Sequence, residues 1–238
     1  MFELGWLNMK KLIILLAVLL AAVAHGFELP RARSAEPEQL SDATLECREK
    51  PVELGIVLDS SKSIWLFDFL HAIKFLQDLV SYFDIGPTKT RVALISFGDG
   101  VHIDQAFNLT TYKSGKEIKA AIGDVEHQIG LYTSTWEAID FMRDHQLDVT
   151  HVRPGLKKVA VVVTDGNSQE GKKTAAAASK AVEQDINMIA VGVGKWVNDQ
   201  ELENIAGGNS NMVIRADNFP RLMEVLGTLR TKICQPNE

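Results

Sequence analysis

The stretch that most constrains this chain is residues 52–63, where a nearly uncharged, branched run ends at an acid and two alternating hydroxyls. The run 52–58 is short and apolar, which favours a strand covered on both faces. Such strands belong to parallel sheets flanked by helices, and ligands bind beyond their carboxyl ends. Asp59, Ser61 and Ser63 lie at such an end. Their hard oxygen atoms favour a small hard cation such as Mg²⁺.

The same Asp-x-Ser-x-Ser pattern also has a simpler interpretation. Ser61 or Ser63 would cap the helix that follows, with Asp59 at the positive end of that helix. This stretch alone does not choose between a cation site and a helix cap, so the choice depends on the rest of the chain.

Residues 1–26 are interpreted as a secretory signal peptide. Lys10 and Lys11 precede the apolar run 12–23, and small residues follow it. The run is shorter than the roughly 20 residues that span a bilayer, and no second apolar run follows, so we expect a secreted protein with no membrane span. An uncleaved anchor helix is the alternative. Translation could start at Met1 or at Met9, and the signal peptide could be cleaved after Ala24 or after Gly26.

Composition narrows the partners of the remaining chain. The net charge is -6, and no basic stripe is present, which argues against nucleic acid and weakens attraction to anionic membranes. Residues 27–46 mix prolines and charges without an apolar period and are interpreted as a flexible lead-in. Residues 47–238 are expected to form one domain.

The two cysteines of the chain, Cys47 and Cys234, bracket that domain. In an oxidising compartment we expect one disulfide between them, which would stabilise the domain by about 5 kcal/mol in the chain-entropy model. Free or intermolecular thiols are the alternative. Asn108 begins the sequon Asn-Leu-Thr and is a candidate glycosylation site.

Strand-like and helix-like segments alternate along the domain, which predicts a doubly wound α/β sheet of about six strands with helices on both faces. Strands are expected at 52–58, 91–97, 101–107, 157–164, 186–193 and 211–215. Helices are expected at 64–83, 113–125, 172–184, 199–206 and 219–233, with another that ends near 145. The turn 98–100 is so short that strand 101–107 must be antiparallel and lie at an edge of the mostly parallel sheet.

Three loops at strand ends carry oxygen ligands. The first holds Asp59, Ser61 and Ser63, the second holds Thr133, and the third holds Asp165, which directly follows strand 157–164. If strands 52–58 and 157–164 are neighbours, these loops converge at the topological switch point of the sheet. Five oxygen-bearing groups, of which two are charged, could hold a hard divalent ion.

These motifs resemble the metal-ion-dependent adhesion site of the von Willebrand factor type A domain. The resemblance covers Asp59-x-Ser61-x-Ser63, the Thr133 loop and the run 164–166, and extends from about 52 to 234. The pattern is similar to that of the secreted, matrix-associated branch, as in matrilins and non-fibrillar collagens, whose domains are also flanked by cysteines.

The resemblance implies a role for each residue. Ser61 and Ser63 would ligate Mg²⁺ (or Mn²⁺ or Ca²⁺) directly, Thr133 directly or through water, and Asp59 and Asp165 largely through water. A carboxylate from an extracellular matrix protein such as collagen would complete the coordination sphere. The family often has small residues before the threonine, whereas Leu131 and Tyr132 stand there in this chain, which makes Thr135 the substitute ligand for Thr133.

Loops around the predicted site supply candidate rim residues, since aromatic side chains are enriched at binding hot spots. For Trp65 and Trp136 we favour core packing instead, and Trp196 is undecided. The rim candidates are Tyr132, Asn167, Ser168 and Glu170.

Two other functions compete with cation-dependent adhesion. A metal-dependent hydrolase would need a positioned base, but the histidines are scattered, and neither a nucleophile elbow nor a phosphate-binding loop is present. The second alternative is a matrix component that self-associates without using the metal site. Little in the sequence argues against it.

Overall fold

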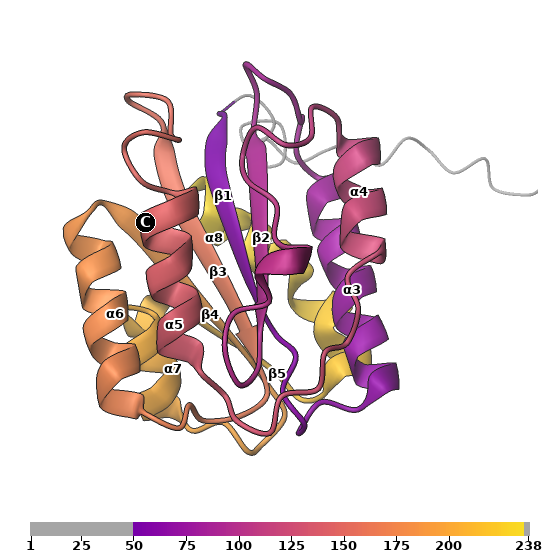
Figure 1. The fold of residues 1–238 in the computed structure, drawn as a ribbon, viewed down its shortest axis with the longest axis vertical. Coiled ribbons are helices and arrows are strands. Elements are labelled where there is room, and N and C mark those ends of the chain that lie inside the picture. Colours follow the sequence, from indigo (N-terminus) through magenta and orange to yellow (C-terminus); the bar gives the residue numbers. More distant parts are fainter. Residues whose placement is uncertain (1–49, 236–238) are drawn as a thin grey trace, which may run out of the picture. The chain divides into compact units, whose positions relative to one another are not determined.

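The computed structural model describes residues 50–235, whose centre is a five-stranded sheet of parallel strands. Its order is β2-β1-β3-β4-β5, so the strand order reverses between β1 and β3 (Figure 1). The strands are β1 Val52–Asp59, β2 Arg91–Phe97, β3 Lys157–Thr164, β4 Ile186–Val193 and β5 Val213–Ala216. The parallel, doubly wound prediction is confirmed.

Continuous runs of branched residues form the three central strands, because side chains on both faces of these strands are covered. All eight residues of β1 are buried, as are the last six of β3. In the register of this pair, Leu58 lies beside Val163. Asp59 and Thr164, one residue further on, therefore leave the sheet side by side.

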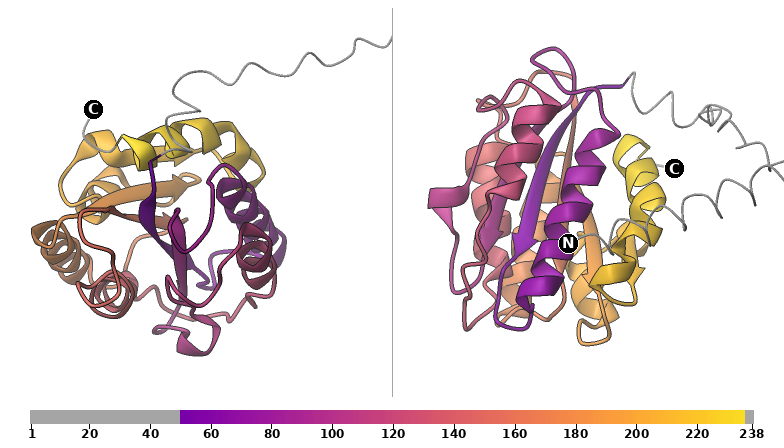
Figure 2. Two further views of the ribbon diagram at one scale, coloured as in Figure 1. Left: turned by 90° about the horizontal axis from the view of Figure 1, so that it is seen from above. Right: turned by 90° about the vertical axis from the view of Figure 1, so that its right-hand side faces the viewer.

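Helices cover both faces of the sheet. α5 and α6 pack against each other on one face, while α3 and α8 lie on the other (Figures 1 and 2). The α-helices are α3 Leu66–Ser81, α4 Gly115–Gly123, α5 Thr135–Phe141, α6 Gly171–Glu183, α7 Asp199–Ile205 and α8 Leu226–Cys234. Shorter turns are η1 Ile103–Gln105, the π-helical η2 Met142–Gln146, η3 Ser210–Met212 and η4 Phe219–Val225.

The expected sixth strand, residues 101–107, is not a strand. It makes two isolated antiparallel bridges to β2, Phe97 with Val101 and Leu94 with Phe107. Between them the chain forms the 3₁₀ turn η1, whose backbone N–H groups bond locally instead of continuing the ladder. Such an interruption at a sheet edge also blocks further strand pairing.

Two expected helices differ from the structure. The helical spacing of the apolar residues in α3 predicts that the whole stripe is core. Phe69, Ile73 and Leu76 are buried, but Leu66 and Leu70 are exposed, so that part of the prediction is wrong. The closing helix is divided into η4 and α8.

Several expectations concern residues outside the described range 50–235. The signal peptide 1–26, the lead-in 27–46 and Cys47 are among them, so the pairing of Cys47 with the buried Cys234 stays a prediction. Within the described range, no helix is long and apolar enough to cross a membrane.

Candidate metal centre

Asp59, the last residue of β1, is fully buried. Its two carboxylate oxygens have separate partners. The Ser61 backbone N–H donates to Oδ1 at 2.8 Å, and the Thr164 hydroxyl donates to Oδ2 at 2.5 Å. The first bond turns the chain after β1, and the second joins the ends of β1 and β3. Both oxygens of Asp59 therefore fix the loop that carries the two serines.

Hydroxyl and carboxylate oxygens run in a chain from that loop to the end of β3. The hydroxyl oxygens of Ser61 and Ser63 lie 3.1 Å apart, and the Ser63 hydroxyl donates to Asp165 Oδ1 at 2.7 Å. Ser61 and Asp165 are buried, whereas Ser63 is exposed. The structure thus brings the first and third predicted loops together through their side chains, with one edge open to solvent.

The Thr133 loop joins the same place through its backbone. Gly130 forms an isolated parallel bridge with Ser61, and its carbonyl accepts from Lys62 N at 2.8 Å. The Thr133 carbonyl accepts from Gln169 N at 3.1 Å, which ties this loop to the segment after β3. All three predicted loops therefore meet at the carboxyl ends of β1 and β3.

The two large side chains that precede Thr133 do not fill the candidate cation site. Leu131 and Tyr132 are exposed, whereas Thr133 and Thr135 are buried. Thr135 is the first residue of α5, and the Ser134 N–H donates to the Gly98 carbonyl at 2.9 Å. Both threonines are therefore held on rigid backbone beside the other two loops.

Burial governs the electrostatics of the two acids. It raises the pKa of Asp59 above its ordinary value, although hydrogen bonds from Thr164 and Ser61 oppose the shift. Burial raises the pKa of Asp165 to about 6, with the Ser63 hydrogen bond opposing and the nearby Asp59 charge adding to it. Each acid is thus costly to ionise without a compensating positive charge.

The arrangement fits a hard divalent cation. Its donors are hydroxyls and carboxylates, which suit ions that prefer oxygen. Among the ion pairs of residues 50–235, none involves Asp59 or Asp165, so no Lys or Arg supplies the missing charge. In the same range no group of three or more His, Cys, Asp or Glu residues is placed so that it could hold a metal ion.

Three further residues support this site, of which Thr164 alone belongs to a motif recognised in the sequence. Thr164 is the buried partner of Asp59. His127 stacks on Phe69 with ring centroids 4.6 Å apart, and burial lowers its pKa despite a backbone hydrogen bond with Ser61. Glu201, buried in α7, accepts from Ser168 N at 3.1 Å. The position of Thr164 directly before Asp165 indicates its role from the sequence, whereas no sequence pattern indicates a role for His127 or Glu201.

Rim candidates divide into exposed and inward-facing side chains. Trp65 is 77% exposed, so the expected core packing is wrong, whereas Trp136 is partly buried against the core as expected. Trp196 is exposed. Of the predicted rim, Tyr132, Asn167 and Glu170 face solvent, but the Ser168 hydroxyl accepts from Thr174 at 2.8 Å and supports the loop instead.

The fold and this crevice define a doubly wound α/β domain with an oxygen-rich cation site at its switch point. Residues 53–228 match the von Willebrand factor type A domain. The chain belongs to this family.

Known proteins resemble the chain over most of its length. It is 35% identical to human matrilin-4, in an alignment that covers 79% of this chain and 30% of matrilin-4. It is 31% identical to the human collagen alpha-1(XXI) chain, in an alignment that covers 79% of this chain and 19% of the collagen chain. The chain therefore spans less than a third of these relatives. The solved structure of proximal thread matrix protein 1 from the mussel byssus, with a zinc-occupied MIDAS motif, matches with a TM-score of 0.72 at 25% identity, covering 79% of this chain and 46% of that one.

Proposed function

We propose that this chain is a secreted adhesion module that binds a divalent cation and, through it, an acidic group on an extracellular matrix protein. The observation that carries the proposal is the continuous contact from Ser61 through Ser63 to Asp165, which unites loops 102 residues apart in sequence. The relatives, matrilins and collagens, are matrix proteins, and a structural neighbour has a metal in its MIDAS motif. Mg²⁺ is the proposed ion, with Mn²⁺ and Ca²⁺ as alternatives.

The burial and the existing hydrogen bonds of each residue indicate its role in the proposed cation site. Ser61, Ser63 and Thr133 supply uncharged hydroxyl ligands, while Asp59 and Asp165 supply negative charge nearby. Because both Asp59 oxygens already hold the loop, Asp59 acts mainly by orienting the serines. When bound, the cation supplies an electrophilic centre for a partner carboxylate.

The exposed edge of the site explains why a partner would complete it. Ser63 faces solvent, and only two carboxylates lie in the cluster. A divalent charge is then not cancelled by strongly bound anionic ligands, so an incoming Glu or Asp side chain gains a favourable interaction.

The proposed glycan at Asn108 would not obstruct this edge. Phe107 bridges to Leu94 in the middle of β2, and the chain then continues toward a hollow lined by Arg91 at the start of that strand. Asn108 therefore lies away from the carboxyl ends where the site is built.

Cation titration of the secreted chain tests the proposal. Calorimetry with Mg²⁺ and Mn²⁺ should show one site, and saturation at about 100 times Kd should stabilise the fold by about 2.7 kcal/mol. Ser63→Ala should weaken cation binding at least tenfold, because it removes one ligand. Ser81→Ala, at the other end of α3, is the matched control. A wild-type chain that binds no divalent cation would contradict the proposal.

Partner capture separates adhesion from the two other functions. Matrix proteins retained from an extract in Mg²⁺ should be lost in EDTA and with Ser63→Ala. Chelator-insensitive retention would favour a self-associating structural component. Phosphatase activity with Mg²⁺ or Mn²⁺ would favour the hydrolase.

A further inference from the structure

Large apolar side chains stand exposed on three sides of the candidate metal centre. Each has 56% to 77% of its surface exposed, although residues of this kind are usually buried. We call them the apolar rim: Trp65, Phe67, Ile129, Leu131, Tyr132 and Trp196. Exposed apolar side chains that gather on one face mark interaction sites in soluble proteins.

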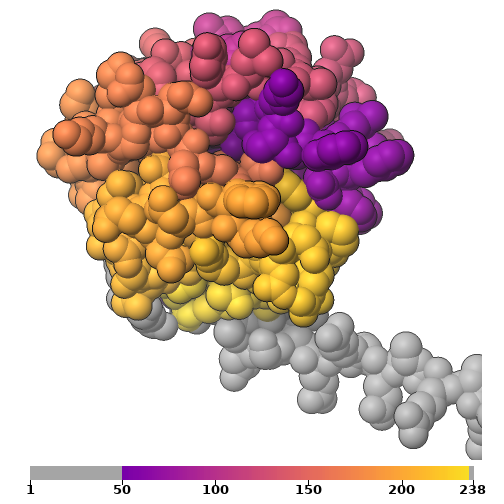
Figure 3. Space-filling view, turned by 90° about the horizontal axis from the view of Figure 1, so that it is seen from below, coloured from indigo at the N-terminus to yellow at the C-terminus, as the bar shows by residue number. Residues whose placement is uncertain are grey.

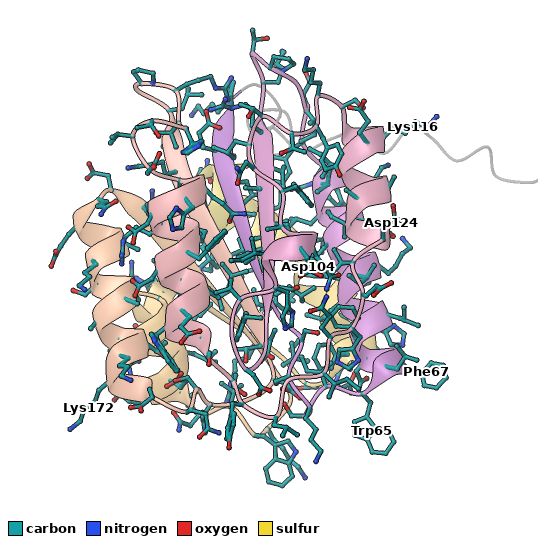
Figure 4. All side chains as sticks on the ribbon, viewed as in Figure 1. Trp65, Phe67, Asp104, Lys116, Asp124 and Lys172 are labelled. Atoms are coloured by element: carbon teal, nitrogen blue, oxygen red, sulfur yellow. The ribbon has the colours of Figure 1, made fainter. Side chains whose placement is uncertain are left out.

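Sequence position and hydrogen bonds place the rim beside the cation ligands. Trp65 comes two residues after Ser63, and Tyr132 directly precedes Thr133. The Trp196 carbonyl accepts from Asn167 Nδ2 at 3.4 Å, in the loop that follows β3. The first turn of α3, the loop before α5 and the loop after β4 meet on one face (Figure 3), and Trp65 and Phe67 project away from the fold (Figure 4).

The side of the rim at Trp196 is concave. A hollow of about 430 Å³ lies at the ends of β4 and β5, between Trp196 and Arg215. Arg215 is held in place, because it donates to the Val197 carbonyl at 2.7 Å and pairs with Asp199 at 3.2 Å. This hollow offers an apolar wall and a fixed polar wall to one side chain of a partner.

The acidic balance of the whole chain acts against strongly acidic partners. At the rim itself the charges nearly balance: Lys62 and Lys195 lie near Asp68 and Asp99, while Glu170 pairs with Lys173 and Arg215 pairs with Asp199. The chain as a whole carries a net charge of -6. An acidic run or an anionic membrane surface would be repelled, whereas a single carboxylate at the cation would not.

We infer that the partner presents one carboxylate flanked closely in sequence by large apolar side chains. The carboxylate meets the cation, one flanking side chain lies on Trp65 and Phe67, and the other enters the hollow beside Trp196. Desolvation of the rim supplies affinity, and the net negative charge of the whole chain disfavours acid-rich sequences. This inference rests on the proposed cation site and specifies what that site recognises.

Immobilised synthetic peptides test the inference with the full secreted chain. One peptide carries Glu between Leu and Phe, and three comparison peptides carry Glu between serines, Gln between Leu and Phe, and a run of three Glu. In Mg²⁺ the Leu-Glu-Phe peptide should bind at least tenfold more tightly than each comparison peptide, and EDTA should abolish its binding. Trp65→Ser and Trp196→Ser should each reduce this binding at least fivefold, whereas Val149→Ser, an exposed apolar residue before β3, should not.

The outcomes separate this inference from the proposed function. If the chain binds the cation but holds the serine-flanked Glu equally well, the rim inference is wrong and the cation site stands. If the Gln peptide binds as tightly as the Glu peptide, or EDTA has no effect, the rim does not act with the cation. If phosphatidylserine vesicles in Mg²⁺ capture the chain, and only this capture is lost with Trp65→Ser, the rim serves a membrane instead of a protein.

Discussion

The Thr164 hydroxyl donates a 2.5 Å hydrogen bond to Asp59 Oδ2, joining two neighbouring strands at the point where both leave the sheet. The other oxygen of Asp59 accepts from the Ser61 backbone. Because the carboxylate is wholly buried, its orientation is set by these bonds and not by solvent. The direction in which the Ser61 and Ser63 hydroxyls point therefore depends on Thr164.

Thr164→Val removes that hydroxyl at nearly constant volume. It leaves a buried carboxylate short of a donor, so the free energy of unfolding should fall by about 1.5–3 kcal/mol. Cation affinity should fall by about 10- to 100-fold, as for other residues that orient ligands. Urea unfolding and cation titration measure the two effects. Thr88→Val, at an exposed threonine, is the matched control, and equal effects of both variants would contradict the prediction.

Asp165 should make the metal-free domain less stable as pH rises from about 4 to about 6. The folded-state pKa of Asp165, about 6, lies above its ordinary value of 3.8. In this window the folded state binds more protons than the unfolded state, so deprotonation favours unfolding, by no more than about 3 kcal/mol for this group. Asp59 shifts in the same direction.

Urea unfolding in EDTA at pH 5 and pH 7 checks the sign. Asp165→Asn should remove the part of this dependence that is due to Asp165. The part that remains combines Asp59 with His127 and His102, whose lowered pKa values make stability rise with pH. Saturating Mg²⁺ should reverse the contribution of Asp165, since cation binding requires deprotonated carboxylates and weakens as pH falls through about 6. A pH dependence that is the same in the wild-type chain and in Asp165→Asn would refute the assignment.

The positions of the buried central strands were predictable because burial on both faces demands continuous apolar runs, and the convergence of the loops follows from those positions. β3 and β4 have the predicted bounds, and β1 differs by one residue. The convergence of Ser63 and Asp165 followed from the order of two such strands.

Features that depend on the tertiary contacts of a residue were not predictable from the sequence. The helical spacing of Leu66 and Leu70 matches that of buried residues, yet both side chains are more than half exposed. The turn η1 interrupts an alternating segment through local backbone hydrogen bonds that the side-chain pattern does not encode. Glu201 supports the Ser168 loop across a sequence separation of 33 residues, with no motif linking the two.

A buried ion cluster at the opposite end of the sheet should matter for stability alone. Glu53 is fully buried and accepts from Arg91 at 2.8 Å through both of its oxygens, and from Arg153 Nε at 2.6 Å. Glu53→Gln leaves two guanidinium groups without their counter-charge, so the free energy of unfolding should fall by about 3–5 kcal/mol. Cation affinity, measured where the variant is folded, should stay within twofold. A larger change would mean that this cluster is coupled to the site.

Gly130 should be required for the placement of the Thr133 loop. A Cβ on this residue would lie 2.3 Å from Asp99 N and 2.5 Å from Gly98 Cα, which are backbone atoms that cannot rotate away. Gly130→Ala must therefore push the loop from the Gly98–Gly100 turn and weaken its bridge to Ser61.

We expect Gly130→Ala to lower cation affinity at least tenfold, with a smaller loss of stability than a core substitution, because the movement is confined to two loops. Gly86→Ala, whose new Cβ would meet only the Lys89 side chain at 3.7 Å, is the matched control. Calorimetric titration of both variants decides the question. If Gly130→Ala leaves cation affinity unchanged, the Thr133 loop does not contribute to the site. The ligands then come from the loops after β1 and β3 alone.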